Sequence, residues 1–200
     1  MSSLLDMLSS QLGGSALQQI SGKIGADERQ TGNAVATALP MLLSALARNS
    51  SKPEGAQALS NALTKDHDGS LLDNLGGFLD RPETGPGDGI LRHVLGARRQ
   101  GVERGLSKAT GMDAGSIGKL LVTLAPVVMG AIGKTQRQNR LDASGLAGLL
   151  GSERAEAERQ APREMGLLGQ LLDTDGDGDV DMSDIAKHGV GALGKLLGGR

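Results

Sequence analysis

The sequence predicts an all-α protein: a tandem repeat of short helices with proline-kinked core helices, followed by a compact acidic segment near the C-terminus. Apolar residues recur at helical spacing along most of the chain. Two 29-residue segments match one another without a gap. No run combines two-residue alternation with β-branched or aromatic residues, so no strand is predicted.

Composition limits the kind of core and the kind of partner. The chain has 200 residues, with 21 Lys and Arg against 23 Asp and Glu, and this balance argues against a general nucleic-acid binder. It has no cysteine, which excludes disulfides and thiolate metal sites. Phe78 is the one aromatic residue, so Leu, Ala, Val, Ile and Met must form the core. The 32 glycines suit helices that pack closely.

The apolar stretches favour core helices. The longest cover residues 34–47 and 120–133, fourteen residues each, whereas a membrane span needs about twenty. We therefore expect no transmembrane segment. The N-terminus lacks the features of a secretory signal. Cytoplasmic placement is the default expectation, and export without a signal is the alternative.

Residues 20–48 align with residues 106–134 at a constant offset of 86. Seven of the 29 positions are identical. The identical pairs are Ser21/Ser107, Gly25/Gly111, Asp27/Asp113, Gly32/Gly118, Thr37/Thr123, Pro40/Pro126 and Ala45/Ala131.

The matched residues have structural roles that predict the same local structure twice. Gly25 and Gly111 fit the C-terminal cap of one helix. Asp27 and Asp113 fit the N-cap of the next, where Gln30 would complete a capping box. The proline that follows in each copy is expected to kink the helix or split it in two.

Other helices are predicted from helical spacing and caps. A capping box at residues 51–54 (SKPE) should open one helix, and Ser70 should cap another. The apolar faces lie within residues 4–12, 17–24, 58–63, 71–79 and 90–95.

These elements divide the chain into four parts. Residues 1–80 form helical repeat 1, and residues 88–151 form helical repeat 2, packed with the first as one unit. Residues 152–164 are charged and read as an exposed helix or a loose tether; we favour a linker because Pro162 would interrupt a helix. Residues 165–200 read as helix, loop and helix.

The acidic segment, DTDGDGDVDMSD, has the spacing of a calcium loop. With Asp173 as position 1, carboxylates fall at positions 3, 5, 7, 9 and 12, and Gly178 stands at position 6, where the loop bends sharply. Position 12 holds aspartate in place of the commoner glutamate, as in dockerin-type calcium loops. The candidate ligands are Asp173, Asp175, Asp177, Asp179, Asp181 and Asp184.

Two interpretations of this EF-hand-like loop stay open. It binds an ion, or it is a solvated acidic turn without metal; the spacing favours the ion. Ca²⁺ is preferred over Mg²⁺, because Mg²⁺ usually keeps several waters. Since the loop is single, we expect structural calcium rather than sensing.

Other candidate motifs are weak. Arg92, Arg98, Arg99, Arg104 and Lys108 form a basic cluster, but without aromatic residues for stacking, nucleic-acid binding is not expected. His67, His93 and His188 share no ligand spacing, and no nucleophile motif is recognised, so we expect no enzyme.

Four segments, DGSLLDNLGGFL (68–79), DGILRHVLGARR (88–99), LAPVVMGAIGK (124–134) and LLDTDGDGDVDMSDIAKHG (171–189), together resemble the bacterial family known as domain of unknown function 937. The resemblance covers nearly the whole chain and implies a helical bacterial protein with a C-terminal acidic loop. It supplies no activity.

The leading hypothesis is a non-enzymatic structural or interaction protein that self-associates and carries a structural calcium site. Its partner would be a second copy or an unknown protein. A calcium-responsive binder that exposes a Leu/Met face is the second hypothesis. An unrecognised enzyme is the third.

Overall fold

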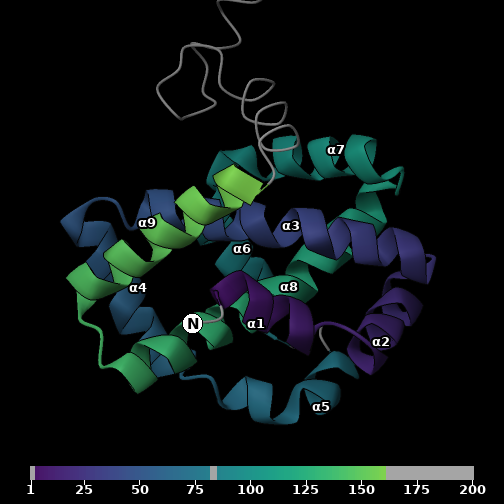
Figure 1. The fold of residues 1–200 in the computed structure, drawn as a ribbon. Helices are drawn as coiled ribbons and strands as arrows, with labels where there is room; N and C mark the ends of the chain where they lie inside the picture. Colours follow the sequence, from purple (N-terminus) through teal and green to yellow (C-terminus); the bar gives the residue numbers. More distant parts are fainter. Residues whose placement is uncertain (1–2, 82–84, 161–200) are drawn as a thin grey trace, which may run out of the picture. The chain divides into compact units, whose positions relative to one another are not determined.

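The computed structural model describes residues 3–81 and 85–160, and these residues form helices and turns with no strand (Figure 1). The prediction of an all-α protein is confirmed for this part of the chain. The α-helices are α1 (Leu4–Gln11), α2 (Ser15–Ile24), α3 (Glu28–Asn49), α4 (Pro53–Asp66), α5 (Leu75–Leu79), α6 (Gly87–Leu95), α7 (Arg99–Thr110), α8 (Ala114–Asn139) and α9 (Ala143–Gln160). Two 3₁₀ helices are η1 (Ser70–Asn74) and η3 (Gly96–Arg98).

The chain divides into two compact units, Met1–Ala157 and Glu158–Arg200. The first contains nearly all of the described residues, and the fold below is that of this unit. Of the second, the structure describes only residues 158–160, the end of α9.

The two longest helices, α3 and α8, pack against each other and form the centre of the core. Helices α1, α2, α4, α6 and α7 and the 3₁₀ helix η1 also pack against α8. As a result, Leu120, Leu121, Leu124, Val127 and Ile132 have no exposed surface. Burial of this apolar face supplies most of the drive to form the helix, since propensity alone is a weak determinant.

The two matched segments take the same local structure. Gly25 and Gly111 end α2 and α7 with φ of 71° and 74°, a left-handed conformation that glycine adopts without a Cβ penalty. Asp27 then accepts hydrogen bonds from the N–H groups of Arg29 and Gln30, and Asp113 accepts one from Ser116. The predicted caps at these four positions are confirmed. Among the described hydrogen bonds, Gln30 makes no return bond to complete a capping box.

Both helices continue through their prolines. Pro40 lies inside α3 and Pro126 inside α8, and both residues are buried. Of the two expected effects of each proline, a kink or a split into two helices, the split is therefore wrong, and the kink stays a prediction. Each proline removes one backbone hydrogen bond, at a cost of about 3 kcal/mol in a helix interior, and the buried residues on both sides of it offset that cost.

Two predicted caps are wrong. Helix α4 has Pro53 at its first position and Lys52 as N-cap, while the Ser51 hydroxyl donates to the carbonyl of Arg48. Proline is preorganised for the first helical position, and this moves the start past the serine. Ser70 does not cap either: its N–H donates to Oδ1 of Asp68, and Asn74 caps α5.

The predicted linker also needs correction, because α9 runs through residues 152–160. These residues are mostly Ala, Glu and Arg, which favour helices, and Pro162 lies beyond the described end. Glu153 is only 9% exposed, so this part of α9 belongs to the packed unit. Residues 161–164 lie outside the described residues.

The first half of the fold, α1–α5, packs extensively against the second half, α6–α9. Helix α2 contacts α8 and α7 contacts α3; in the same way α1 contacts α8 and α6 contacts α3. Several hydrogen bonds cross between the halves at buried or partly buried positions, and three of these are donated by the side chains of Ser116, Asn49 and Gln136. They run from Ser116 Oγ to Ile24 O (3.1 Å), from Asn49 Nδ2 to Val94 O (3.1 Å) and from Gln136 Nε2 to Ser60 Oγ (2.7 Å).

Glycines mark the points where backbones meet. A Cβ placed on Gly133 of α8 would lie 1.8 Å from the carbonyl oxygen of His67. A Cβ on Gly87 of α6 would lie 2.0 Å from that of Val122. No side chain fits at either distance, so these helix contacts require glycine.

We predict that Gly133→Ala lowers the free energy of unfolding by about 1–3 kcal/mol or more, because the methyl group forces α8 away from the end of α4. Gly22→Ala is the matched control: Gly22 is exposed in α2, with nothing within 4 Å of the added Cβ. The control should gain up to about 1 kcal/mol from helix propensity. Urea unfolding followed by circular dichroism measures both, and equal midpoints for the two variants would contradict the close approach.

Candidate functional site

The six predicted calcium ligands lie outside the described residues. Each of Asp173, Asp175, Asp177, Asp179, Asp181 and Asp184 falls in the segment 161–200. The calcium loop therefore stays a prediction from sequence spacing. What the structure describes is the helical unit that precedes it.

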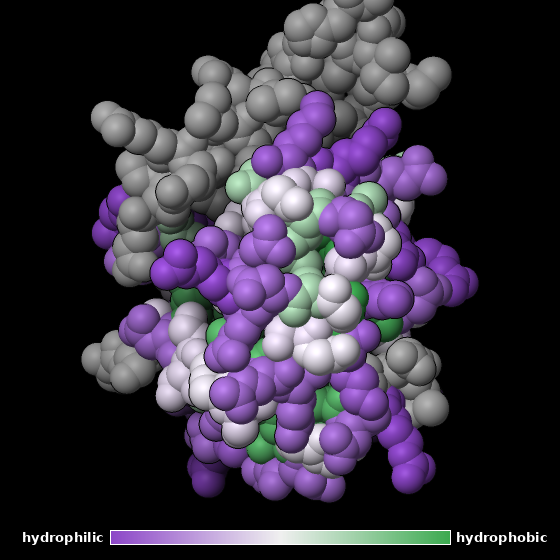
Figure 2. Space-filling view, turned by 90° about the vertical axis from the view of Figure 1, so that its right-hand side faces the viewer, coloured by the Kyte–Doolittle hydropathy of each residue, from purple (hydrophilic) through white to green (hydrophobic). Residues whose placement is uncertain are grey.

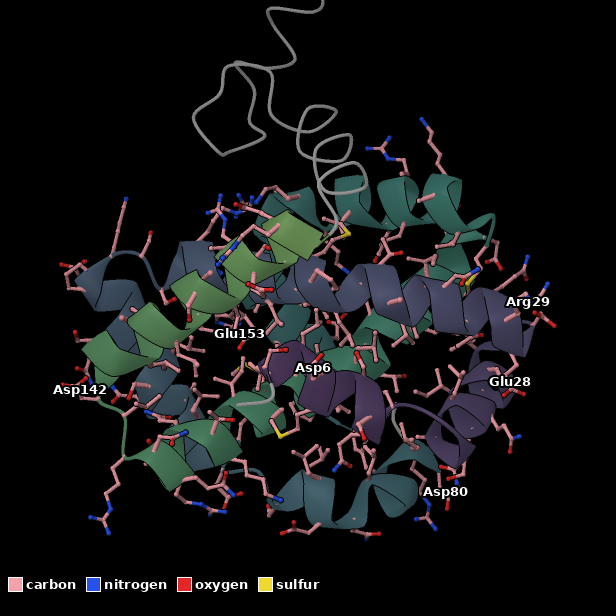
Figure 3. The ribbon with its side chains drawn as sticks, viewed as in Figure 1. Asp6, Glu28, Arg29, Asp80, Asp142 and Glu153 are labelled. Carbon is pink, nitrogen blue, oxygen red and sulfur yellow. The ribbon has the colours of Figure 1, made fainter. Side chains whose placement is uncertain are left out.

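Within residues 3–81 and 85–160, no group of three or more His, Asp or Glu side chains is arranged to hold a metal ion. Figure 3 labels several acidic residues, and they lie at separate places, for example Asp80, Asp142 and Asp6. Some acidic residues of this unit stabilise helix ends, as Asp27 and Asp113 do, and others pair with basic residues, as Asp88 does.

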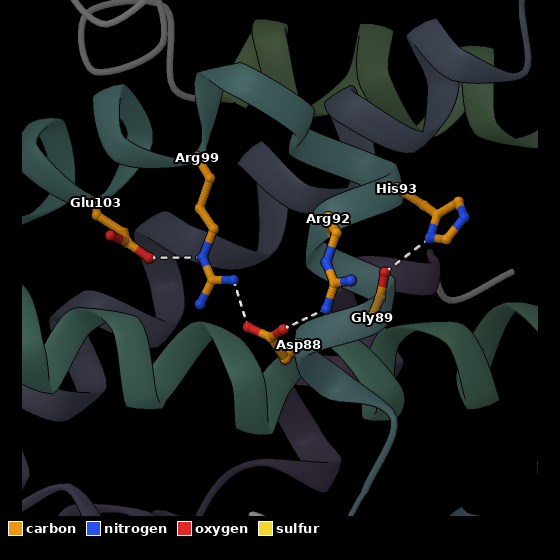
Figure 4. Close-up of polar contacts among 6 residues, drawn as sticks. All are labelled: Asp88, Gly89, Arg92, His93, Arg99 and Glu103. Atoms are coloured by element: carbon orange, nitrogen blue, oxygen red, sulfur yellow. Dashed lines mark hydrogen bonds and ion pairs between the residues drawn. The ribbon is translucent and has the colours of Figure 1, made fainter.

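Among the described residues, one connected group of ion pairs lies where α6 and α7 meet (Figure 4). Asp88, in the first turn of α6, accepts from Arg92 at 2.8 Å and from Arg99 at 2.5 Å. The Arg99 Nε donates to Glu103 at 2.9 Å. Gly96, with φ of 53°, turns the chain between the two helices. The group therefore ties the start of α6 to the start of α7.

The electrostatics of this group are those of satisfied ion pairs. Hydrogen bonds from Arg99 and then Arg92 hold the pKa of Asp88 below its ordinary value. Asp88 and then Glu103 raise the pKa of Arg99. Two acids meet two bases, so each of the four charges has a partner of opposite sign. Exposed pairs of this kind contribute at most about 1 kcal/mol each.

These contacts pair two of the five residues in the basic cluster seen in the sequence. Arg92 and Arg99 are paired within it. Further along, Lys134 pairs with Asp73 and Arg137 with Asp68, both at 3.2 Å, and these bonds hold η1 and the turn before it to α8. Paired arginines are less available to a phosphate backbone.

The histidines that the structure describes lie apart from any cluster. His67 caps the C-terminal end of α4, and burial lowers its pKa. The Nδ1 of His93 bonds the carbonyl of Gly89 at 2.9 Å. His188 lies outside the described residues. No described hydrogen bond joins the ring of either histidine to a hydroxyl group.

Sequence reasoning missed Glu153, the buried acidic residue of α9. Its carboxylate accepts the N–H groups of Leu4 at 2.9 Å and of Leu5 at 3.3 Å (Figure 3). A carboxylate at a helix N-terminus satisfies orphan donors and meets the positive end of the helix dipole. Glu153 therefore ties α9 to the start of α1. No local sequence signal marks this role, because the partners are 149 and 148 residues away.

One cavity of about 320 Å³ opens between the α1–α2 turn and α5. Its lining has no Asp, Glu, His, Lys or Arg, and therefore no group suited to acid–base chemistry. The lining residues are Ser10, Gln11, Gly13, Ser15, Ala16, Gln19, Leu75, Gly76 and Leu79.

Helix α8 is longer than the fourteen-residue apolar stretch seen in the sequence, and by length and composition alone it could cross a membrane. It has 26 residues and an 18-residue window of mean hydropathy 1.7. In the structure 78% of that window is buried by the rest of the unit. One such helix is weak evidence for a span, and its burial favours a core helix.

Large apolar side chains are covered throughout the described part of the chain. No Leu, Ile, Val, Met or Phe in residues 3–81 and 85–160 is exposed, although several are half-buried. On the face shown in Figure 2, hydrophobic residues appear only in small patches between polar ones. The unit therefore offers no broad apolar patch for docking.

Comparison with known proteins gives one match. The family model described as bacterial protein of unknown function (DUF937) matches residues 6–135. Neither the curated proteins nor the solved structures include a match to the chain. The matched region covers α1 to most of α8, and so includes both of the aligned segments.

We predict that Glu153→Ala lowers the free energy of unfolding by about 1–3 kcal/mol, because it leaves two N–H groups at the start of α1 without their acceptor. Glu153→Gln keeps one acceptor oxygen and should lose less. Hydrogen exchange read by mass spectrometry should show faster exchange in residues 4–8 of the alanine variant. Unchanged protection there would refute the tie between α9 and α1.

We also predict an acid-sensitive contribution from Asp113, whose pKa is held below its ordinary 3.8 by hydrogen bonds from Ser116. A lowered folded-state pKa stabilises the fold above the ordinary value, and this contribution is lost as the pH falls through the folded-state pKa. Asp113→Asn keeps a capping side chain but cannot titrate. Its unfolding free energy should therefore fall less below pH 3.8 than that of the unmodified chain.

Asp80→Asn is the control for this measurement, since no described hydrogen bond engages that exposed carboxylate. Urea unfolding at a series of pH values gives all three curves. Parallel curves for Asp113→Asn and the unmodified chain would rule out the assigned role of Asp113.

Proposed function

The chain belongs to the DUF937 family of bacterial proteins of unknown function, and we propose that it is a non-enzymatic structural or interaction protein. In this proposal a helical unit carries a C-terminal segment with one structural calcium site, and the protein self-associates. The observation that carries the calcium site is the spacing of six aspartates and Gly178 over residues 173–184.

The described residues support a scaffold rather than a catalyst. The charged groups around Asp88 are paired, the cavity beside α5 has no titratable lining, and the buried carboxylate of Glu153 accepts hydrogen bonds from backbone N–H groups. A reacting site would need convergent polar groups with a free acid, base or nucleophile.

We also propose that the two halves are a tandem repeat. Seven identical positions at one offset support this, together with the matching caps at Gly25 and Gly111 and at Asp27 and Asp113. The contacts support it as well, because α2 against α8 is matched by α7 against α3. Two copies that each cover the other's long helix bury more apolar surface than either copy alone.

A calcium-responsive binder is the second candidate, and the described surface favours it less. Such a protein exposes a Leu/Met face to its partner. The half-buried and buried Leu and Met residues of the described unit are packed within it, so exposing them would require the core to open. A calcium-dependent face, if there is one, would come from residues 161–200.

The expected affinity of the proposed calcium site indicates in which compartment it would be occupied. The aspartate at position 12 should bind weakly, with a dissociation constant on the order of 10⁻⁵ to 10⁻³ M. Free calcium in a bacterial cytosol is scarce, so a weak site of this kind would fill more readily outside the cell than in the cytoplasm, which is the default expectation.

We predict that calorimetric titration of the intact chain shows one bound Ca²⁺ in that affinity range, with Mg²⁺ weaker. Asp173→Ala with Asp177→Ala should abolish the heat, because two ligands are lost. The control replaces two exposed acids of the described unit, Asp66→Ala with Asp80→Ala, and should keep binding, since it removes the same charge from outside the loop.

Loss of binding in both double variants would show a diffuse electrostatic effect rather than a site. No heat with the intact chain would remove the calcium proposal, whatever the variants do.

A further inference from the structure

We propose that self-association occurs by exchange of halves: α1–α5 of one chain pack against α6–α9 of a second copy, and the reverse. This inference rests on the proposed self-association and names its interface. The partner is a second copy of the chain, and the interface is the one that the two halves already make within one unit.

The interface between the halves holds much of the core. Helix α8 of the second half packs against α1, α2, α3 and α4 and against η1, and α3 packs against α6 and α7. Leu39 and Leu43 on α3 and Leu120 and Val127 on α8 are almost completely buried. A half that lost its counterpart would therefore expose its longest apolar helix.

The link between the halves has no large apolar side chain. Residues 80–86 read DRPETGP and hold no Leu, Ile, Val, Met or Phe. Exchange of halves therefore removes no large apolar side chain of the link from the core. The remaining cost is the entropy of association, which higher protein concentration offsets.

The outer surface gives the second argument. Because no large apolar side chain of the described residues is exposed, the closed unit has no apolar patch on which a second closed unit could dock. The well-packed apolar interface that this part of the chain offers is the one between the halves. Exchange uses that interface without any new surface.

A cysteine pair can distinguish the two arrangements, because the chain has no cysteine of its own. A Cβ built on Gly130 of α8 lies 3.9 Å from the Cβ of Leu71 in η1. This separation matches the roughly 3.8 Å of a disulfide. The pair joins the first half to the second, so its disulfide is intrachain in a closed unit and interchain in an exchanged dimer.

The matched control lies within one half. A Cβ on Gly145 is 3.5 Å from that of Leu141, and both residues belong to the second half. A disulfide between Leu141→Cys and Gly145→Cys is therefore intrachain in either arrangement. A band at twice the chain mass in this control would show that oxidation forms non-specific disulfides between chains.

The experiment begins with size-exclusion chromatography and light scattering of the full-length chain over a range of concentrations. The dimer fraction of Leu71→Cys with Gly130→Cys is then oxidised and run on a non-reducing gel. We expect a band at twice the chain mass for this variant and a band at the chain mass for the control.

The outcomes separate the two proposals. A dimer whose Leu71/Gly130 disulfide stays at the chain mass would overturn exchange and leave self-association through another surface, such as residues 161–200. A chain that is monomeric at every concentration would overturn self-association itself, and exchange with it. Circular dichroism of each reduced variant checks that the helical fold is retained.

Discussion

The close approach of helix backbones at glycine is the constraint on which the rest of this fold depends. With Phe78 as its one aromatic residue, the chain fills its core with Leu, Ala, Val, Ile and Met. Smaller side chains reach native packing density only if the helices lie closer together. Gly133 against His67 O and Gly87 against Val122 O provide that closeness, because no Cβ fits between them. Glycine is therefore required at these two positions, because it lets α4 and α6 pack closely against α8.

Apolar packing of this kind is not directional, so a few polar contacts must fix how the helices are set against one another. Ser116 Oγ binds the last carbonyl of α2, Asn49 binds the end of α6, and Glu153 binds the start of α1. Each of these side chains satisfies a backbone group that a helix end leaves without a partner. The contacts therefore specify register and also remove the penalty of burying helix ends. They join segments far apart in sequence, which is why the first and second halves form one unit.

Local signals in the sequence predicted local structure, and they failed where a neighbour or a distant partner competed. Gly25, Asp27, Gly111 and Asp113 act within one turn, and the structure confirms all four caps. Ser51 does not cap α4, because Pro53 fixes the start of that helix one residue further along. Ser70 is not an N-cap either: its N–H donates to Asp68, and Asn74 caps α5. Glu153 was assigned to a linker because its neighbours are charged; its acceptor role depends on α1, which sequence spacing cannot place. The acidic segment at residues 173–184 is a local pattern too, but it lies outside the described residues. The calcium site that its spacing indicates therefore stays a prediction.

The distribution of charge links the scaffold to that predicted loop. Residues 161–200 hold seven acidic and four basic side chains, whereas the rest of the chain holds 16 acidic and 17 basic ones. The near-neutral total therefore combines a balanced helical part with an acidic end, and six of the seven acids at that end are the candidate ligands. A bound Ca²⁺ would cancel two negative charges where they are most crowded. In the helical part, carboxylates such as those of Asp27, Asp88 and Glu153 are held by N–H groups or arginines. In the proposed arrangement the two regions therefore compensate negative charge by different means, and calcium removal should affect the acidic end while α3 and α8 stay packed.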